Sequence, residues 1–320
     1  MEPLIRTVDL KKYFKTADGY LHAVDGINIS IQRGETIGVV GESGCGKSTL
    51  GRLLIRLLEP TDGQIFFNGA DIVRYSKKET RSFRKNAQII FQDPYSSLNP
   101  RLTVSEIIAE PIIVNRMLKK PDEINQRVFQ MMDKVGLAAR LVNAYPHELD
   151  GGRRQRIGIA RALALDPEFI VCDEPVSALD VSIQAQIINL LMDLQDEDGL
   201  TYMFITHDLS VVKHISDHIA VMYLGVCVEK APAKQLFQKP MHPYTKALLK
   251  AIPKASITSR NQKIEVLRGE VTSPINMKAG CRFQARCPFA KEDCGGSEIP
   301  LVEVEPNHFV SCKYVGEINA

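Results

Sequence analysis

The sequence predicts an α/β protein: a core with a mainly parallel sheet, an antiparallel β subdomain and a helical insertion, then a small cysteine-rich C-terminal extension. Short apolar runs typical of buried strands alternate with amphipathic helical stretches along most of the chain. The strand pattern disappears between about residues 99 and 154, where helical spacing takes over. Seven prolines and four of the seven cysteines follow residue 235, so we expect a domain boundary there.

The individual elements follow from hydrophobic periodicity and turn residues. Apolar runs bounded by polar or turn residues predict strands within residues 34–41, 87–91, 169–172 and 201–205. Helical spacing predicts helices over residues 47–59, 123–135 and 181–194. Asn68-Gly69 is typical of a hairpin turn, which predicts an antiparallel element over residues 66–72. Strands that alternate with helices favour a parallel sheet covered on both faces.

Composition excludes several classes of protein. Forty basic residues against thirty-eight acidic ones leave a net charge of +2, which argues against a dedicated nucleic-acid binder. No apolar run approaches the roughly 18 residues that cross a bilayer, and the first twenty residues lack the apolar core of a signal peptide. We therefore expect a cytosolic chain, in which a disulfide framework is disfavoured.

Residues 41–48, GESGCGKS, match the phosphate-loop pattern G-x-x-x-x-G-K-[ST] between a predicted strand and a predicted helix. Backbone N–H groups of such a loop and the helix N-terminus attract phosphate, Lys47 reaches the β- and γ-phosphates, and Ser48 offers a hydroxyl to Mg²⁺. The alternative is a glycine-rich turn with a surface lysine, and Cys45 is interpreted as loop filling. The candidate ATP-binding residues here are Gly41, Ser43, Gly44, Cys45, Gly46, Lys47, Ser48 and Thr49.

A carboxylate pair ends the predicted strand at residues 169–172. Phosphoryl transfer needs a metal carboxylate and a group that orients or deprotonates the attacking water. Asp173 is the candidate for Mg²⁺, through water, and Glu174 is the candidate general base. An Asp-Glu pair after an apolar run is common, so the phosphate loop is what favours the catalytic interpretation.

Four further motifs resemble those of ABC-transporter ATPases, in matching order through residues 1–235. They are ELDGGRRQR at residues 148–156, Gln92 in IIFQDP, the turn Ser177-Ala178-Leu179-Asp180, and His207 in FITHD. The resemblance implies a P-loop ABC-type ATPase core over residues 1–235, with a helical subdomain at about 99–154, and a separate extension over 236–320. It also implies ATP and Mg²⁺ as ligands, and a head-to-tail dimer that binds two ATPs between one subunit's phosphate loop and the other's signature.

The resemblance also assigns roles to single residues. Gln92 would contact the metal and the γ-phosphate and report occupancy to a membrane subunit. His207 would hold the γ-phosphate and the attacking water, and Asp180 would lie across the dimer interface. An aromatic residue near the start should stack on adenine, with Phe14 the best match and Tyr13 the alternative. Each residue also has a structural interpretation: a satisfied polar end-group, or core packing for Phe14.

The signature departs from the family pattern at one residue of chemical consequence. The family usually has Leu-Ser-Gly-Gly-Gln, whereas this chain has Leu149-Asp150-Gly151-Gly152-Arg153. A carboxylate at Asp150 donates no hydrogen bond to the partner's γ-phosphate and repels it, although Arg153 compensates in part and the amides of Gly151 and Gly152 remain. We therefore expect a heterodimer with a second, different ATPase subunit. The alternative is that Asp150 is tolerated.

Residues 241–249, MHPYTKALL, resemble the His-Pro-Tyr segment of ATPase subunits from oligopeptide, dipeptide and nickel importers. Residues 91–100 and 145–148 also resemble that branch. The resemblance implies a translocase that energises di- or oligopeptide import from the cytoplasmic face of the membrane. Its implied partners are two integral permease subunits and, indirectly, an extracytoplasmic solute-binding protein. Nickel import remains an alternative, as does a soluble ABC ATPase acting on nucleic acid or ribosomes.

The extension contains Cys281, Cys287, Cys294 and Cys312, with five, six and seventeen residues between them. Four thiolates can bind zinc or an iron–sulfur cluster, and no tight C-x₂₋₄-C pair typical of structural zinc is present. The wide spacing favours [4Fe–4S], and members of the importer subfamily with a similar pattern are associated with such a cluster. Zinc, disulfides and four unrelated cysteines stay open. A cluster here would be structural, although an iron–sulfur sensor that binds nucleotide is a further alternative.

Overall fold

The computed structural model describes residues 2–251 and 273–319, and the chain divides into two compact units. Unit 1 comprises Met1–Ile31, Thr36–Val73 and Thr206–Ala320. Unit 2 comprises Gln32–Glu35 and Arg74–Ile205. In the described part of the chain, no helix is both long enough and apolar enough to span a bilayer.

Unit 1 contains an antiparallel sheet in the order β2-β1-β5-β6, with β3 also paired to β1. Its strands are β1 (Ile5–Thr16), β2 (Gly19–Ile27), β3 (Ser30–Ile31), β5 (Asp62–Phe67) and β6 (Ala70–Asp71). Asn68 and Gly69 join β5 to β6 with φ angles of 50° and 75°. Two positive φ angles define the turn that suits a two-residue hairpin, so the predicted antiparallel element is confirmed.

A second set of strands in unit 1 carries the phosphate-loop segment. β4 (Thr36–Val40) is buried throughout and pairs in parallel with β10 (His218–Tyr223). Antiparallel pairing then continues outward from β10 through β11 (Val226–Pro232) and β13 (His308–Val310) to β12 (Val302–Glu305). The C-terminal extension therefore adds two strands to the edge of the sheet that contains β4.

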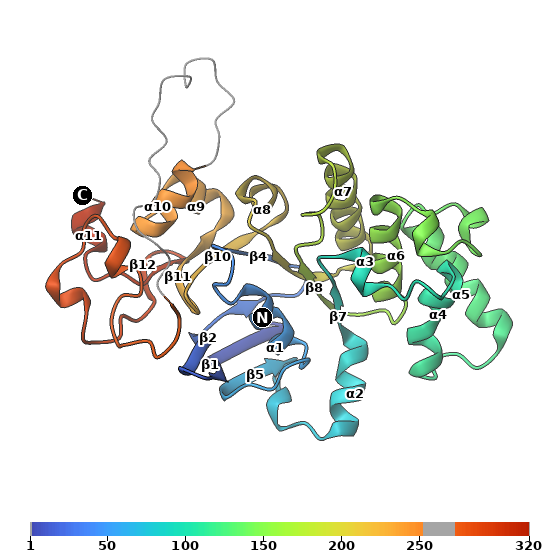
Figure 1. The fold of residues 1–320 in the computed structure, drawn as a ribbon, viewed down its shortest axis with the longest axis horizontal. Coiled ribbons are helices and arrows are strands. Elements are labelled where there is room, and N and C mark those ends of the chain that lie inside the picture. Colours follow the sequence, from blue (N-terminus) through green and yellow to red (C-terminus); the bar gives the residue numbers. More distant parts are fainter. Residues whose placement is uncertain (1, 252–272, 320) are drawn as a thin grey trace, which may run out of the picture. The chain divides into compact units, whose positions relative to one another are not determined.

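The described part of unit 1 also contains five α-helices. They are α1 (Lys47–Leu54), α8 (Leu209–Ile215), α9 (Ala233–Gln238), α10 (Pro243–Lys250) and α11 (Val315–Ile318). Figure 1 shows α9 and α10 beside β10 and β11. The prediction of a helix over residues 47–59 was too long, because Arg56 takes a φ of 56° and turns the chain out of the helix.

A buried carboxylate on β11 holds the His-Pro-Tyr segment, residues 241–249, against that strand. Glu229 is 0% exposed and accepts hydrogen bonds from the backbone N–H groups of Met241 (2.8 Å) and His242 (2.9 Å). Its Oε1 also lies 2.7 Å from Nε2 of His308, on β13. Burial without partners would cost a carboxylate several kcal/mol, so these bonds to Glu229 fix the start of α10 against the sheet.

Unit 2 contains three parallel strands, β7 (Ala87–Ile90), β8 (Phe169–Asp173) and β9 (Thr201–Ile205). Its helices are α2 (Lys77–Asn86), α3 (Pro94–Ser97), α4 (Val104–Val114), α5 (Pro121–Lys134), α6 (Gly151–Leu163) and α7 (Val181–Asp198). α4, α5 and α6 pack on one another (Figure 1). No strand occurs between residues 99 and 154, all of which are described, as the periodicity predicts.

Candidate functional site

The phosphate loop, residues 41–48, joins the buried end of β4 to the start of α1 in unit 1. Lys47 is 5% exposed, and its Nζ donates to the backbone oxygens of Gly41 (2.8 Å) and Glu42 (2.9 Å). Gly46 occupies the position before the helix with a φ of 104°, and no side chain caps the helix. The first turn of α1 contains no acidic residue, so its positive potential is not neutralised locally.

Two glycines of this loop are required by close backbone packing within unit 1. A Cβ on Gly41 would lie 2.2 Å from the backbone oxygen of Met222, and one on Gly46 would lie 1.9 Å from that of Ala23. Both residues also have positive φ angles that other residues rarely adopt. Cys45 is buried beside them, and burial raises the pKa of its thiol. The loop is thus a tightly packed structure rather than an open glycine-rich turn.

The candidate adenine-stacking residues lie on β1 of the same unit. The Tyr13 ring stacks on His22 at 4.1 Å, and its hydroxyl donates to Asp25 at 2.5 Å. Phe14, on the other face of the strand, is half-buried, with Nζ of Lys12 5.1 Å from its ring centre. His207 is exposed in the turn before α8, whose first turn is capped by Asp208.

The candidate catalytic carboxylates, Asp173 and Glu174, lie at the end of the parallel strand β8 in unit 2. β7 and β8 pair in register with Ile90 opposite Cys172, so the segments that follow both strands leave the same edge. Asp173 is 3% exposed, and Glu174 takes a φ of 48°. Nε2 of Gln92 donates to Oε2 of Glu174 at 3.0 Å. Two residues that the sequence singled out separately are therefore in direct contact.

The left-handed conformation of Glu174 is unusual for a residue with a side chain. Its backbone N–H donates to the oxygen of Ile205 at 2.9 Å, and its own oxygen accepts from the N–H and Oγ of Ser177. Such conformations cost roughly 1–3 kcal/mol and persist where surrounding bonds impose them, commonly at active sites. No sequence pattern signalled this conformation, and Arg56, Arg116 and Leu224 also adopt it, so at Glu174 it accompanies the motif and does not by itself identify a catalytic residue.

The signature segment begins α6, also in unit 2. Asp150 is the N-cap: its Oδ1 accepts from the N–H of Arg153 at 2.8 Å, and its Oδ2 lies 3.3 Å from the Arg153 guanidinium. A Cβ on Gly152 would lie 2.7 Å from Cγ2 of Ile183, on α7. Asp180 is exposed at the N-cap of α7. The aspartate thus fills the structural role of a serine cap while adding a charge.

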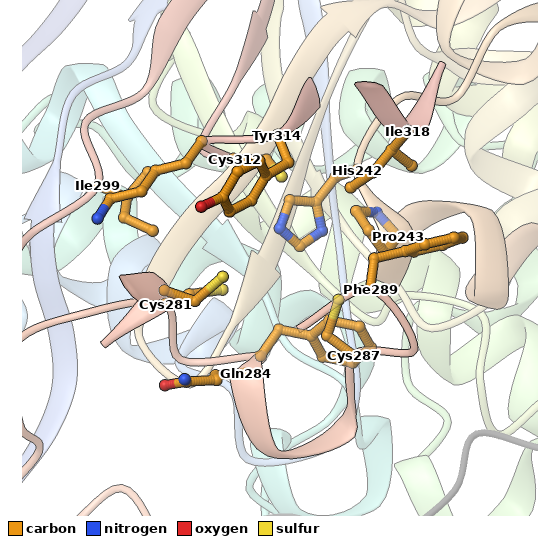
Figure 2. Close-up of a pocket in the computed structure, with 13 residues that line it drawn as sticks. His242, Pro243, Cys281, Gln284, Cys287, Phe289, Ile299, Cys312, Tyr314 and Ile318 are labelled. Atoms are coloured by element: carbon orange, nitrogen blue, oxygen red, sulfur yellow. The ribbon is translucent and has the colours of Figure 1, made fainter. Parts of the chain in front are cut away.

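The four cysteines of the extension line one small cavity in unit 1. Its walls include Cys281, Cys287, Cys294 and Cys312, together with His242 (Figure 2). Burial raises the pKa of Cys281 to about 11 and also raises that of Cys287 and Cys312. None of the cysteines is in a disulfide. In the described residues, no three His, Cys, Asp or Glu side chains lie close enough together to hold a single metal ion.

The N–H of Lys291 donates to Sγ of Cys294 at 3.5 Å. Backbone groups at Phe283, Phe289 and Tyr314 act to lower the pKa of Cys281, Cys287 and Cys312 respectively, against the larger effect of burial. Such contacts lower the energy of a thiolate.

His242 borders the same cavity, and its Nδ1 accepts from the Tyr244 N–H at 3.1 Å. Burial lowers its pKa to about 4, so the ring is neutral near pH 7 and carries its proton on Nε2.

Comparisons with known proteins identify the class to which this fold belongs. A family model described as ABC transporter matches residues 24–177. The chain has a TM-score of 0.66 and 29% identity to the dimeric, post-hydrolysis state of an ATP-binding cassette bound to ADP and Pi, covering 72% of this chain and 98% of that one. The chain has a TM-score of 0.67 and 31% identity to cbiO1 from Clostridium perfringens, and the match covers 75% of this chain and 92% of cbiO1. The chain is thus an ATPase of the ABC class, and the predicted mixed α/β cassette is confirmed.

Relatives over the full length define the branch. The chain is 51% identical to the putative oligopeptide transport ATP-binding protein YkfD of Bacillus subtilis, covering 97% of this chain and 95% of the relative. It is 48% identical to the dipeptide transport ATP-binding protein DppF of Haemophilus influenzae, covering 98% and 97%. A model described as oligopeptide/dipeptide transporter, C-terminal region, matches residues 228–294. The chain belongs to the family of ABC transporter ATP-binding proteins with this C-terminal region.

Proposed function

We propose that this chain hydrolyses ATP to energise import of di- and oligopeptides, as a peripheral subunit at the cytoplasmic face of the membrane. The observation that carries the proposal is the identity of about 50% to peptide-transport ATP-binding proteins, which extends over both the ATPase region and the C-terminal region. Two integral permeases would bind the transported solute, and an extracytoplasmic binding protein would deliver it.

We assign the nucleotide chemistry to the residues already singled out. Backbone N–H groups of residues 41–49 and the Lys47 ammonium bind the phosphates, and Phe14 stacks on adenine. Ser48, Gln92 and Asp173 hold Mg²⁺, which when bound neutralises phosphate charge. The tight phosphate loop supports the first assignment.

Glu174 then acts as general base toward the attacking water, and His207 holds that water and the γ-phosphate. Gln92 is positioned to sense both, because its amide already donates to Glu174 at 3.0 Å. ATP binding favours the closed dimer over the open one, and hydrolysis reverses this preference. The resulting shift between the two populations changes the conformation of the membrane subunits.

We further propose that the working dimer contains a second, different ATPase subunit. Asp150 places a carboxylate where a signature faces the partner's γ-phosphate, and unit charges about 4 Å apart interact by about 4 kcal/mol at an effective dielectric of 20. ATP hydrolysis at the site that uses this chain's signature is therefore impaired. The other site, which uses this chain's own phosphate loop, requires a partner with a normal signature. Purified chain that forms ATP-dependent homodimers with two equally active sites would contradict this proposal.

We propose a structural [4Fe–4S] cluster bound by Cys281, Cys287, Cys294 and Cys312. The donor set supports the proposal: four thiols line one cavity, and the N–H of Lys291 donates to Sγ of Cys294 at 3.5 Å. The wide spacing of the four cysteines, without a tight C-x₂₋₄-C pair, favours such a cluster over a structural zinc ion. When bound, the cluster cross-links the segments around residues 281, 287, 294 and 312.

Purification without oxygen distinguishes the candidates for this site. A brown protein that absorbs near 400 nm and contains about four irons and four sulfides per chain supports the cluster. A colourless protein with one zinc per chain contradicts it, and so does a protein that contains neither metal. Cys287→Ser and Cys45→Ser form a matched pair, since only the first should lower the iron content.

Reconstitution with the membrane subunits tests the transport assignment. ATP hydrolysis that rises on addition of the solute-binding protein and a peptide, together with peptide uptake into vesicles, supports the proposal. Nickel uptake without peptide uptake would show that the transported substrate is nickel and not a peptide, and the assignment of the chain as an ATPase would still hold. Copurification with ribosomes or nucleic acid, and not with permeases, would contradict transport.

A further inference from the structure

The cysteine-rich extension makes a direct ion pair with the phosphate loop inside unit 1. Nη1 and Nη2 of Arg286 lie 2.8 Å and 3.1 Å from the two carboxylate oxygens of Glu42, the second residue of the loop. The arginine side chain is 6% exposed and the glutamate side chain 24% exposed. A bidentate, largely buried pair of this kind has defined geometry and is stronger than a surface ion pair.

A second contact fixes the backbone of the same glutamate. The N–H of Glu42 donates to the hydroxyl of Tyr244 at 2.9 Å. Tyr244 is 0% exposed, and its ring packs against Tyr223 at 4.7 Å and Phe283 at 5.4 Å. Burial raises the pKa of this hydroxyl, so it stays protonated and neutral. The tyrosine of the His-Pro-Tyr segment thus holds the loop from a rigid aromatic cluster.

The backbone oxygen of Glu42 accepts from the Lys47 ammonium at 2.9 Å. Glu42 therefore contacts three residues: Lys47 through its backbone oxygen, Tyr244 through its backbone N–H, and Arg286 through its carboxylate. A shift of this residue would move the bond that orients the lysine. An unpaired carboxylate inside an anion-binding loop would also repel phosphate, so Arg286 both positions and neutralises Glu42.

The arginine belongs to the segment that contains the cysteines. It precedes Cys287 directly, and its guanidinium also reaches the Tyr223 hydroxyl at 3.4 Å. A parallel contact occurs after Cys281, where Arg282 donates to the carboxylate of Asp25, which accepts from the Tyr13 hydroxyl at 2.5 Å. Of the two arginines next to cysteines, Arg286 therefore contacts the phosphate loop directly, and Arg282 contacts Asp25, which bonds Tyr13, the neighbour of the proposed adenine residue.

We propose that Arg286 and Tyr244 are positioning residues for the phosphate loop, so that the affinity of this chain for ATP depends on its C-terminal extension. The inference rests on the proposed role of residues 41–48. The extension is then a determinant of nucleotide binding in addition to any structural role of its cysteines. Loss of Arg286 leaves the Glu42 carboxylate unpaired in the loop, which weakens ATP binding without removing a group that touches the nucleotide.

Titration of the full-length chain with Mg-ATP in a calorimeter tests this inference. Arg286→Gln should weaken binding about tenfold, which corresponds to about 1.4 kcal/mol. Tyr244→Phe, which keeps the ring and removes only the hydroxyl, should weaken it about threefold, on the order of the 0.5–1.5 kcal/mol of one hydrogen bond. Arg286→Lys keeps the charge and should be intermediate. In the assembled transporter, KM for ATP should rise while kcat changes by less than about twofold.

A double-mutant cycle separates positioning from general damage to the fold. The single variant Glu42→Gln and the double variant Glu42→Gln, Arg286→Gln should both bind within about threefold of the parent chain, because no unpaired carboxylate is left in the loop. A variant that merely unfolds would not recover in this way. Lys239→Ala is the matched control, since it removes a cation of the extension that pairs with Glu305 instead of the loop.

Lys47→Ala distinguishes failure of the inference from failure of the proposed function. If Lys47→Ala abolishes binding while Arg286→Gln and Tyr244→Phe bind as tightly as the parent chain, the inference is wrong and the loop assignment stands. If Lys47→Ala has no effect, the loop assignment itself fails. Equal weakening by Lys239→Ala and Arg286→Gln would also overturn the inference, because charge on the extension alone would then explain the result.

Discussion

Two helix N-termini in this chain use their backbone amides differently. α1 begins after Gly46, with no side-chain cap and no acidic residue in its first turn. α6 begins after Asp150, whose carboxylate accepts from the N–H of Arg153 at 2.8 Å. In the proposed site the amides of α1 bind phosphate, whereas the first turn of α6 has a carboxylate of its own at the cap. One residue at the cap therefore decides whether a helix start attracts or repels phosphate.

The contrast is one of charge and not of backbone geometry. Asp150 has the extended backbone of an ordinary N-cap, which a serine would share. Its ion pair with Arg153 spans 3.3 Å between side chains that are 59% and 49% exposed, so solvent screens most of that interaction. A serine in this position would keep the cap and remove the charge, which makes the difference between the two helix starts open to experiment.

Glu174→Gln should have the largest effect, because it removes the proposed general base while preserving shape. We expect ATP hydrolysis by the assembled transporter to fall about 10²- to 10⁴-fold, with ATP still bound. The equivalent change in the partner ATPase should cost much less, since that site faces Asp150. The rate of phosphate release measures ATP hydrolysis in both variants. Equal losses of hydrolysis would contradict the proposed difference between the two ATP sites.

Lys47→Ala should rank next, since it removes the cation from the uncapped helix start. Hydrolysis should fall about 10²- to 10³-fold, as for loss of one preorganised donor to a reacting phosphate. Unlike Glu174→Gln, this variant should also lose most of its affinity for Mg-ATP. Calorimetry of the full-length chain measures that affinity, with Lys239→Ala as the control. Unchanged affinity would show that the uncapped end of α1 is not the phosphate site.

Much of the α1 region was predictable because the chemistry is local. Strand, loop and helix are contiguous from Thr36 to Leu54, so periodicity and one motif define them. The contact between Gln92 and Glu174 needed only the rule that parallel strands end at one edge. The assignment of Lys47 and Glu174 to catalysis came from the same motifs and remains a prediction.

The rest depended on contacts that no local pattern encodes. Arg286 meets Glu42 across 244 residues of sequence, and the His-Pro-Tyr segment was visible only as a subfamily marker. The left-handed backbone of Glu174 arises from its partners Ile205 and Ser177, not from its own preference. Strands β12 and β13 were missed because they are short, with four and three residues, and only β12 lies at the edge of the sheet.

Asp150→Ser tests the capped helix start directly and should have a moderate effect. Hydrolysis at the site that uses this signature should rise about threefold to tenfold, since a hydroxyl donor replaces a repelling carboxylate. Stability should change little, because serine and aspartate cap equally well, whereas Asp150→Ala should lower the free energy of unfolding by about 1 kcal/mol. Phosphate release and thermal unfolding measure the two effects. A faster rate in Asp150→Ala but not in Asp150→Ser would contradict the role given to the hydroxyl.

Cys45→Ala should have the smallest effect, although the residue lies within the phosphate loop. Its side chain is 3% exposed and packs beside Gly41, and its Sγ lies 3.8 Å from Nζ of Lys47. Because burial raises its pKa, the thiolate fraction at pH 7 is below that of a free cysteine, and alkylation should be slow at pH 7 and accelerate as the pH rises. We expect affinity for Mg-ATP within about twofold of the parent chain, since the amides that bind phosphate belong to the backbone. A tenfold loss in Cys45→Ala would mean that side-chain packing, and not only backbone geometry, keeps the helix start of α1 open to an anion.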